Sequence, residues 1–339
     1  NAPQKVKAAA IKALEQDDTH YTHSLGKISL REAIVDYYRK SYGVEIDKDR
    51  IVVTSGTSPA MVMALGVLLN DGDEVIMPNP HYACYPNFVR IFRGVVKDIN
   101  VEEADGFKYN MDKLKAAINE NTKAIFVNSP ANPTGAVYNG RELKAIAALG
   151  RTVISDEIYH GLVYEGECHS MLEYTDNAIV LNGFSKLFAM TGFRLGYAIV
   201  PPEMARTFQK MQQNFYLCAG SFVQEAAIAA LTEDCSAELA EMKATYNKRR
   251  LFLAKRLEEM GIAPLCTPQG AFYMLANVKK YTNDSHKFAL EVLKNAKVAL
   301  TPGIDFGSNA QGYLRISYAN SLENIREGLD RLEKYLKTL

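Results

Sequence analysis

Short apolar runs alternate with stretches of helical spacing along the first part of the chain. The runs are rich in β-branched side chains and are bounded by glycine, proline or polar residues, as buried strands are. The stretches between them carry apolar residues on one face, as amphipathic helices do. This alternation predicts an α/β fold with a mainly parallel sheet sandwiched by helices. The predicted strands lie at residues 50–54, 71–77 (a turn and a strand), 123–128, 152–155, 178–181 and 197–200, and the helices between them at residues 28–42, 59–69, 112–118 and 141–148.

The pattern changes after residue 235. A long, charged helix is predicted first, and short strands and a final helix follow it, which is typical of an α+β arrangement. These elements lie at residues 237–260, 271–274, 298–300, 313–317 and 321–337. A further amphipathic helix is predicted at residues 3–15. We therefore expect a large α/β domain at residues 20–235 and a smaller α+β domain formed by residues 1–19 and 236–339.

Composition and charge narrow the classes of partner. The 339 residues carry 39 basic and 39 acidic side chains, and this balance argues against a nucleic acid or an anionic membrane surface as the partner. No apolar run approaches the roughly 18 residues that a membrane span needs, and no signal peptide is visible. Five widely spaced cysteines form no C-x-x-C pair, so neither a disulfide framework nor a zinc site is predicted. We expect a cytoplasmic protein.

Residues suited to chemistry follow the predicted strands. Gly56, Tyr82, Asn132, Asp156 and Lys186 each come shortly after one of them. In parallel α/β sheets, ligands bind outside the carboxyl ends of the strands. The shared placement therefore predicts a single ligand site at that edge of the sheet. No Gly-x-Gly-x-x-Gly follows the first strand, which argues against a nicotinamide-dependent dehydrogenase.

Two of these positions indicate a particular chemistry. Lys186 has small and apolar neighbours, and loss of hydration lowers the pKa of a lysine amine; the neutral amine can form a Schiff base with an aldehyde. Taken alone, such a lysine is more often a solvated loop residue. The turn at residues 55–58 joins a strand to a helix start, which can bind phosphate through free N–H groups. A simple N-cap explains the same pattern equally well.

Residues 182–196 resemble the lysine signature of the class I/II aminotransferases, enzymes that use pyridoxal 5′-phosphate (PLP). Segments 130–135, 156–159, 268–272 and 314–317 resemble further motifs of that family, so the likeness extends over essentially the whole chain. It implies the aspartate aminotransferase-like fold. It also implies transfer of an amino group between an α-amino acid and a 2-oxo acid by a ping-pong mechanism with a Lys186 Schiff base. The shared positions of the signature are Gly183, Ser185, Lys186, Ala189, Gly192, Arg194 and Gly196.

The resemblance also implies a role for each candidate cofactor-binding residue. Lys186, Asp156 and Tyr159 are the catalytic set. Asp156 keeps the pyridine nitrogen protonated, and Asn132 and Tyr159 hydrogen-bond the phenolate oxygen of the ring. Tyr82 stacks on the ring face. The phosphate is expected to lie among Gly56, Thr57, Ser58 and Arg194.

One position departs from the family pattern at the phosphate. Many relatives carry a serine where this chain has Gly183. A hydroxyl contact to the phosphate is therefore either missing or supplied by Ser185.

The resemblance further implies how substrate and subunits meet. Arg315 pairs with the α-carboxylate of the substrate, with Asn132 beside it. Tyr21 lies where relatives place a tyrosine that crosses to the phosphate of the partner subunit, which implies a homodimer. Relatives usually carry an N-terminal arm before the helix at residues 3–15, and without that arm we expect cofactor binding to survive and substrate binding to weaken.

Other readings of the same residues stay open at this stage. A PLP-dependent β-lyase or decarboxylase uses the same scaffold, and an aminotransferase-like domain can also be non-catalytic. The amino acid and keto acid are not identified, because fold analogy does not choose a side chain. His81, His160 and His169 have no metal-ligand spacing, so we expect no metal and interpret these histidines as structural.

Overall fold

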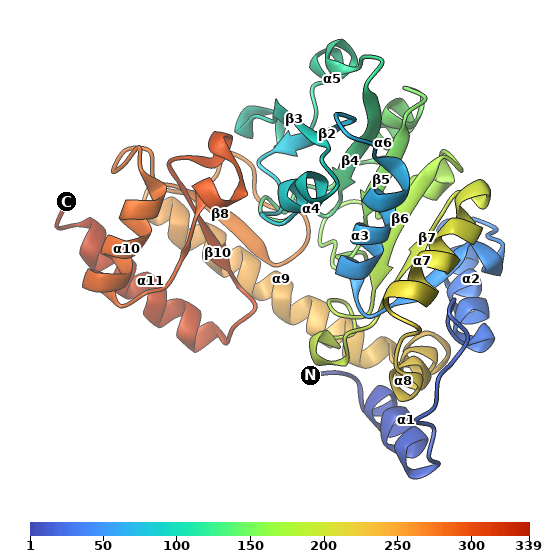
Figure 1. Cartoon of the computed structure of the whole chain (residues 1–339). Helices are drawn as coiled ribbons and strands as arrows, with labels where there is room; N and C mark the ends of the chain where they lie inside the picture. The colour runs from blue at the N-terminus through green and yellow to red at the C-terminus, as the bar shows by residue number, and fades with distance from the viewer.

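The computed structural model describes residues 1–339 and consists of a larger and a smaller body joined by a long helix (Figure 1). The larger body contains a seven-stranded sheet with helices on both sides. Its strands are β1 (Ile51–Thr54), β2 (Glu74–Asn79), β3 (Val95–Asn100), β4 (Thr122–Asn128), β5 (Thr152–Asp156), β6 (Ala178–Gly183) and β7 (Gly196–Ile199). Its helices are α1 (Gln4–Glu15), α2 (Ile28–Tyr42), α3 (Thr57–Leu68), α4 (Tyr85–Ile91), α5 (Met111–Ala117), α6 (Gly140–Ala147), α7 (Ala205–Phe215) and α8 (Ser221–Thr232).

The strand order of the large sheet is β1-β7-β6-β5-β4-β2-β3. The neighbours from β6 through β3 pair in parallel, and β7 pairs antiparallel with both β6 and β1. All strands except β7 therefore run in one direction, and the mainly parallel sheet is confirmed. Their carboxyl ends meet at a single edge, and the residues that precede β7 lie at that same edge.

Alternate residues of the strands pack into two separate cores. In β5, Val153 contacts the core formed with α2, α6 and α8, whereas Ile154 contacts the core formed with α3 and α7. Successive side chains of a strand point to opposite faces, so a sheet covered on both sides needs apolar residues at every position. The strands appear as near-continuous apolar runs in the sequence because both faces of the sheet are covered.

The smaller body is an antiparallel three-stranded sheet covered by two helices. The long helix α9 (Ser236–Glu259) connects it to α8, as Figure 1 shows. The strand predicted at residues 298–300 is wrong, because the short strand of this region starts just after residue 300 and pairs with its neighbour only at Thr301 and Pro302. The elements are β8 (Tyr273–Asn277), β9 (Thr301–Pro302), β10 (Tyr313–Ser317), α10 (Ser285–Ala296) and α11 (Leu322–Leu336).

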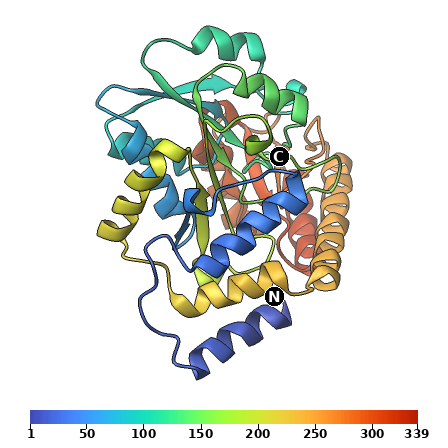
Figure 2. The same ribbon diagram turned by 90° about the vertical axis from the view of Figure 1, so that its right-hand side faces the viewer.

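Helix α1 lies alongside α8 of the larger body (Figure 2). Its buried residues Val6 and Ala10 belong to the same core as the strands of the large sheet. The backbone N–H of Gln4 also donates to Glu238 at the start of α9. The two-domain division of the chain stays a proposal, and this packing favours grouping residues 1–19 with the large body rather than the small one. No helix in the structure has both the length and the apolar character to cross a membrane.

A buried carboxylate joins the two bodies. Glu103 follows β3, and its side chain accepts hydrogen bonds from Tyr313 Oη at 2.7 Å, Leu265 N at 2.9 Å and Asn277 Nδ2 at 3.1 Å. All three donors belong to the smaller body. A charged acceptor with three donors fixes the strand β10 relative to the large sheet.

We expect Glu103→Ala to destabilise the protein by about 3 kcal/mol, because it leaves buried donors without an acceptor. The measurement is thermal unfolding followed by circular dichroism. Glu102→Ala is the matched control, since Glu102 is the exposed neighbour and makes no side-chain hydrogen bond. Equal melting temperatures for the two variants would show that Glu103 does not hold the bodies together.

Candidate active site

A cavity of about 380 Å³ lies at the carboxyl edge of the large sheet, where the smaller body faces it. Its walls come from the ends of β1, β2, β4, β5 and β6, from the residues before β7, and from β8 and β10 of the smaller body. The structure thus brings together residues that are far apart in the sequence. The lining is Thr57, Ser58, Tyr82, Tyr85, Asn128, Asn132, Asp156, Ile158, Tyr159, Ser185, Lys186, Thr191, Arg194, Tyr273 and Arg315.

Lys186 follows β6 and places its amine beside two aromatic rings. Its Nζ lies 5.7 Å from the ring centroids of both Tyr159 and Phe272. Burial lowers the pKa of Lys186, and the nearby guanidinium groups of Arg194 and Arg315 lower it further, against the opposing charge of Asp156. A lowered pKa populates the neutral, nucleophilic amine.

Asp156 is the last residue of β5 and is buried at 6% exposure. Its Oδ2 accepts a hydrogen bond from Tyr85 Oη at 2.7 Å, and its Oδ1 accepts one from the Ile158 N–H at 3.1 Å. Burial raises the pKa of the Asp156 carboxyl, whereas these two hydrogen bonds and Lys186 favour its charged form. A buried carboxylate aimed into a cavity can hold a proton on a ligand nitrogen.

The opposite end of the cavity is suited to an anion. Helix α3 begins at Thr57, and no side chain caps its N-terminus, so its first N–H groups are free to donate to a ligand. Arg194 has a left-handed backbone (φ 54°), and its Nη1 donates to the Thr191 carbonyl at 2.9 Å. Gly56 has φ 98°, and a Cβ there would lie 2.6 Å from Arg194 Nη2. Glycine is therefore required for the guanidinium to approach the helix start.

The strand β10 brings an arginine from the smaller body into the cavity. Arg315 Nη1 donates to Asn132 Oδ1 at 3.0 Å, and its guanidinium lies 4.4 Å from the Tyr273 ring centroid. Burial lowers the pKa of Arg315, and its Nε is buried without a hydrogen-bond partner. No carboxylate of the protein pairs with this group, so the site can take a carboxylate from a ligand.

Two tyrosines border the space between the anion end and Arg315. Tyr82 is 37% exposed and contacts the edge of the Tyr85 ring at a centroid distance of 5.4 Å. Burial raises the pKa of Tyr82 to about 12. Tyr159 is 4% exposed, and its Oη donates to Tyr273 Oη at 3.2 Å. Both hydroxyls stay protonated at neutral pH and can donate hydrogen bonds.

Five lining residues were not among the site residues predicted from the sequence: Tyr85, Asn128, Ile158, Thr191 and Tyr273. Tyr85 bonds Asp156, and Tyr273 packs on Arg315. Asn128 Nδ2 donates to the Asp156 carbonyl, and its Oδ1 accepts from the Asn132 N–H. The position of Asn128 at the end of a predicted strand was a usable signal. Tyr85 and Tyr273 are the first residues of α4 and β8, and neither directly follows a predicted strand of the large sheet.

Neither Gly183 nor Tyr21 lines the cavity. A Cβ on Gly183 would lie 2.8 Å from Gly196 Cα, so the close approach of β6 and β7 leaves no room for a serine side chain here. Ser185 lines the cavity and is the hydroxyl available in its place. Tyr21 does not reach this cavity: it is 83% exposed and lies beside a second hollow with Leu217 and Cys218.

The residues of the cavity fit the PLP that the sequence resemblance implies. The donor set has an amine for an aldehyde, a buried carboxylate for a ring nitrogen, and an uncapped helix start with an arginine for a phosphate. The buried, partnerless Nε of the half-buried Arg315 marks a second anion position, on the side of the smaller body. These complementary positions lie in one cavity.

Comparison with known proteins gives a consistent picture. A family model described as aminotransferase class I and II matches residues 1–332. A (5-formylfuran-3-yl)methyl phosphate transaminase of Methanocaldococcus jannaschii is 41% identical over 342 residues, covering 99% of this chain and 88% of the relative. An aspartate aminotransferase of Pyrococcus abyssi is 38% identical over 347 residues, with 99% and 89% coverage. The solved structure of an aromatic aminotransferase from Pyrococcus horikoshii superposes with a TM-score of 0.96 at 37% identity, covering 100% of this chain and 93% of that one.

Proposed function

The chain belongs to the class I and II aminotransferase family and is a PLP-dependent transaminase, and from that premise we propose that it works by a ping-pong mechanism centred on Lys186. Its substrates are an α-amino acid and a 2-oxo acid. The observation that supports the mechanism is the meeting of an amine, a buried carboxylate and an arginine without a carboxylate partner in one cavity. The roles of individual residues given below are part of the proposal.

PLP, when bound, supplies an aldehyde that takes up the amino group and a ring that accepts the electrons released at the substrate carbon. Lys186 would hold the aldehyde covalently. Lys186 Nζ would also accept the proton from the substrate α-carbon. Its lowered pKa supports both roles, because each needs the neutral amine. Asp156 would keep a proton on the ring nitrogen.

The remaining residues bind and orient. Arg194 and the start of α3, with Gly56, Thr57 and Ser58, would hold the phosphate, and Ser185 would add a hydroxyl. Asn132 would donate to the phenolate oxygen, Tyr159 would do so by turning its one hydroxyl proton away from Tyr273 Oη, and Tyr82 would lie on the ring face. Arg315 would pair with the substrate α-carboxylate beside Asn132.

We also propose that the protein is a homodimer. Tyr21 and Leu217 are 83% and 54% exposed and border the same hollow, which gives an apolar surface suited to a second copy. In a homodimer, Tyr21 would donate its hydroxyl to the phosphate end of the partner's cavity. A cytoplasmic setting is proposed as well, supported by five cysteines that are all unpaired in the structure.

Acceptor dependence tests the reaction. Purified protein with PLP is incubated with an amino-acid mixture, with and without added 2-oxo acids, and amino-acid loss is measured by mass spectrometry. A transaminase consumes amino acids beyond one equivalent of enzyme only when a 2-oxo acid is present. Consumption without an acceptor would instead indicate a β-lyase or a decarboxylase on the same scaffold.

Arg315→Gln is expected to lower kcat/KM for amino acids by about 100-fold, mainly through KM, because a paired charge on the α-carboxylate is lost. The variant should also lose discrimination between an amino acid and the primary amine that lacks its carboxylate. Arg141→Gln, at an exposed position of α6, is the matched control. Retained discrimination in Arg315→Gln would exclude Arg315 as the carboxylate ligand.

A further inference from the structure

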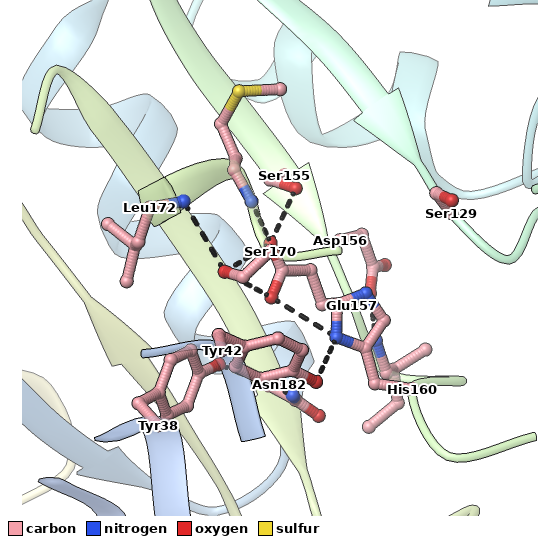
Figure 3. A network of polar contacts seen from close by, with 12 residues as sticks. Tyr38, Tyr42, Ser129, Ser155, Asp156, Glu157, His160, Ser170, Leu172 and Asn182 are labelled. Atoms are coloured by element: carbon pink, nitrogen blue, oxygen red, sulfur yellow. Dashed lines mark hydrogen bonds and ion pairs between the residues drawn. The ribbon is translucent and has the colours of Figure 1, made fainter. Parts of the chain in front are cut away.

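The residue that follows Asp156 points away from the cavity into the interior of the larger body. Glu157 is 1% exposed. Its Oε1 accepts hydrogen bonds from Ser155 Oγ at 3.0 Å and from the Met171 N–H at 2.9 Å, and its Oε2 accepts one from Ser170 Oγ at 2.9 Å. Figure 3 shows this network directly behind Asp156. The proposed mechanism makes no use of Glu157.

His160 is the ionisable partner of this carboxyl group. Its Nδ1 lies 3.4 Å from Glu157 Oε2 and 2.7 Å from Tyr42 Oη, and the residue is 3% exposed. The His160 ring also hydrogen-bonds the backbone of Ser129. No lysine or arginine pairs with Glu157. A buried carboxylate without a cation is unfavourable, so a proton on the pair stabilises it.

No lysine or arginine is among the ionisable groups around the pair. Burial raises the pKa of the Glu157 carboxyl to about 8 and lowers the pKa of the His160 imidazole to about 3. Glu173 disfavours the charged form of Glu157, and His169 disfavours that of His160. The other ionisable groups that face Glu157 are Tyr37, Tyr38, Tyr42, Tyr197 and Cys168.

The pair touches the two segments that carry the proposed cofactor contacts. Asp156 and Tyr159 lie on either side of Glu157 in the loop after β5, and the His160 N–H donates to the Glu157 carbonyl. Ser129, which His160 bonds, begins the segment that leads to Asn132 and donates its own N–H to the Asp156 carbonyl. A change in the pair therefore reaches both segments through direct contacts.

We propose that Glu157 and His160 are positioning residues that hold one proton between them, and that this proton keeps the loop at residues 156–160 in the geometry that aims Asp156 and Tyr159 into the cavity. The positioning role rests on the proposed function of those two residues. The proton sharing does not, because it is a property of the protein without cofactor.

The number of protons on Glu157 and His160 determines how the stability of the protein changes with pH. In the folded chain the pair keeps one proton from about pH 3 to about pH 8. In the unfolded chain, with ordinary pKa values of 4.5 and 6.5, it holds two protons below pH 4.5, one between, and none above pH 6.5. The raised pKa of Glu157 therefore gives stability that is fully present below pH 4.5 and is lost as pH rises to 8. The lowered pKa of His160 has the opposite effect: its contribution to stability is fully present above pH 6.5 and is lost as pH falls to 3.

Glu157→Gln removes the titration of the Glu157 carboxyl group, because glutamine keeps the shape and hydrogen-bonding groups of the protonated acid and does not titrate. We expect the melting temperature of Glu157→Gln, relative to that of wild type, to rise by about 5 °C between pH 5 and pH 8. Above pH 8 this difference should stay constant. The matched control is Glu167→Gln: that carboxylate also lies near a histidine, with 3.6 Å to His169 Nε2, but its side chain is 86% exposed. A constant difference between Glu157→Gln and wild type across this range would overturn the shared proton.

Nitrogen NMR of histidine-labelled protein reads the other half of the pair. With His160→Asn used for assignment, the His160 ring is expected to stay neutral from pH 5 to 9 and to show a shift with a midpoint near pH 8 that Glu157→Gln removes. A ring that takes up a proton near its ordinary pKa of 6.5 would contradict the proposal.

The pH dependence of kcat/KM in the holoenzyme tests the positioning role of Glu157. We expect the alkaline fall in kcat/KM near pH 8 to diminish in Glu157→Gln, and a roughly tenfold loss in Glu157→Ala at pH 7 to be largely restored by glutamine. An unchanged alkaline limb would refute positioning. Absence of transamination in wild type, with the pH-dependent stability difference intact, would refute the proposed function and leave the shared proton standing.

Discussion

Lys186→Ala is expected to lower kcat/KM for transamination by about 10⁴-fold or more, the largest loss of any single substitution in this chain. The lysine has two proposed roles, covalent attachment of the cofactor and proton transfer at the substrate α-carbon. Both need an amine at this place, and its pKa is lowered by burial. No other lysine lines the cavity, so none can substitute for it.

The measurement compares wild type, Lys186→Ala and Lys210→Ala under saturating PLP. Lys210 is exposed on α7 and serves as the control for loss of a lysine as such. The residues proposed to hold the phosphate are unchanged in Lys186→Ala, so the variant should still bind PLP. Small primary amines in solution should restore part of the activity by supplying the missing base. Activity of Lys186→Ala within tenfold of wild type would contradict the assignment.

Asp156→Asn is expected to lower kcat/KM by about 10³-fold. A carboxylate beside a ring nitrogen raises the pKa of that nitrogen by several units, and each unit corresponds to about 1.4 kcal/mol between the two protonation states. Asparagine keeps the size of the side chain and an acceptor for Tyr85, but it removes the charge. The ring nitrogen would then lose the proton that makes it an electron acceptor.

The stability of Asp156→Asn distinguishes loss of the ring proton from misfolding of the variant. Burial raises the pKa of Asp156 in the folded protein, and a group with a raised folded pKa loses its contribution to stability as pH rises through that pKa. At pH 7 the cofactor-free Asp156→Asn protein should therefore be as stable as wild type or more so. Asp105→Asn, at an exposed position, is the control for activity. An Asp156→Asn enzyme with normal kcat/KM would show that the ring proton does not depend on Asp156.

The sequence was most informative where one local feature decides the structure. Apolar runs predicted the strands of the large sheet, and the direction shared by β1, β4, β5 and β6 brings the residues that follow them to one edge. Family membership, expected from residues 182–196, is confirmed by the match over residues 1–332. A helix begins directly after Gly56, and Gly56 lies beside Arg194; its role toward a ligand stays a prediction.

Features that depend on packing between distant segments could not be predicted from periodicity. Asn132 and Arg315 are 183 positions apart in the chain and meet only because the smaller body folds against the large sheet. The antiparallel direction of β7 follows from its short connection to β6, which a pattern of apolar residues does not encode. The strand β9 has too few paired residues for an alternating pattern, so its boundaries were misplaced.

Helix α10 and the aromatic partners were missed for different reasons. The N-cap of α10 was visible in the sequence, since Asp284 accepts from the Lys287 N–H, yet no helix was predicted there. Tyr85 and Tyr273 look like ordinary core aromatics of a helix and a strand. Their polar contacts to Asp156 and Tyr159 become evident only in three dimensions.

Borohydride trapping tests the central claim most directly. The purified protein is loaded with PLP, its visible absorption is recorded, the sample is reduced, and a proteolytic digest is examined by mass spectrometry. We predict an absorption band that reduction removes, and a cofactor adduct on the peptide that contains Lys186 and on no other. An unmodified Lys186 peptide, or an adduct on a different lysine, would contradict the site and the mechanism built on it.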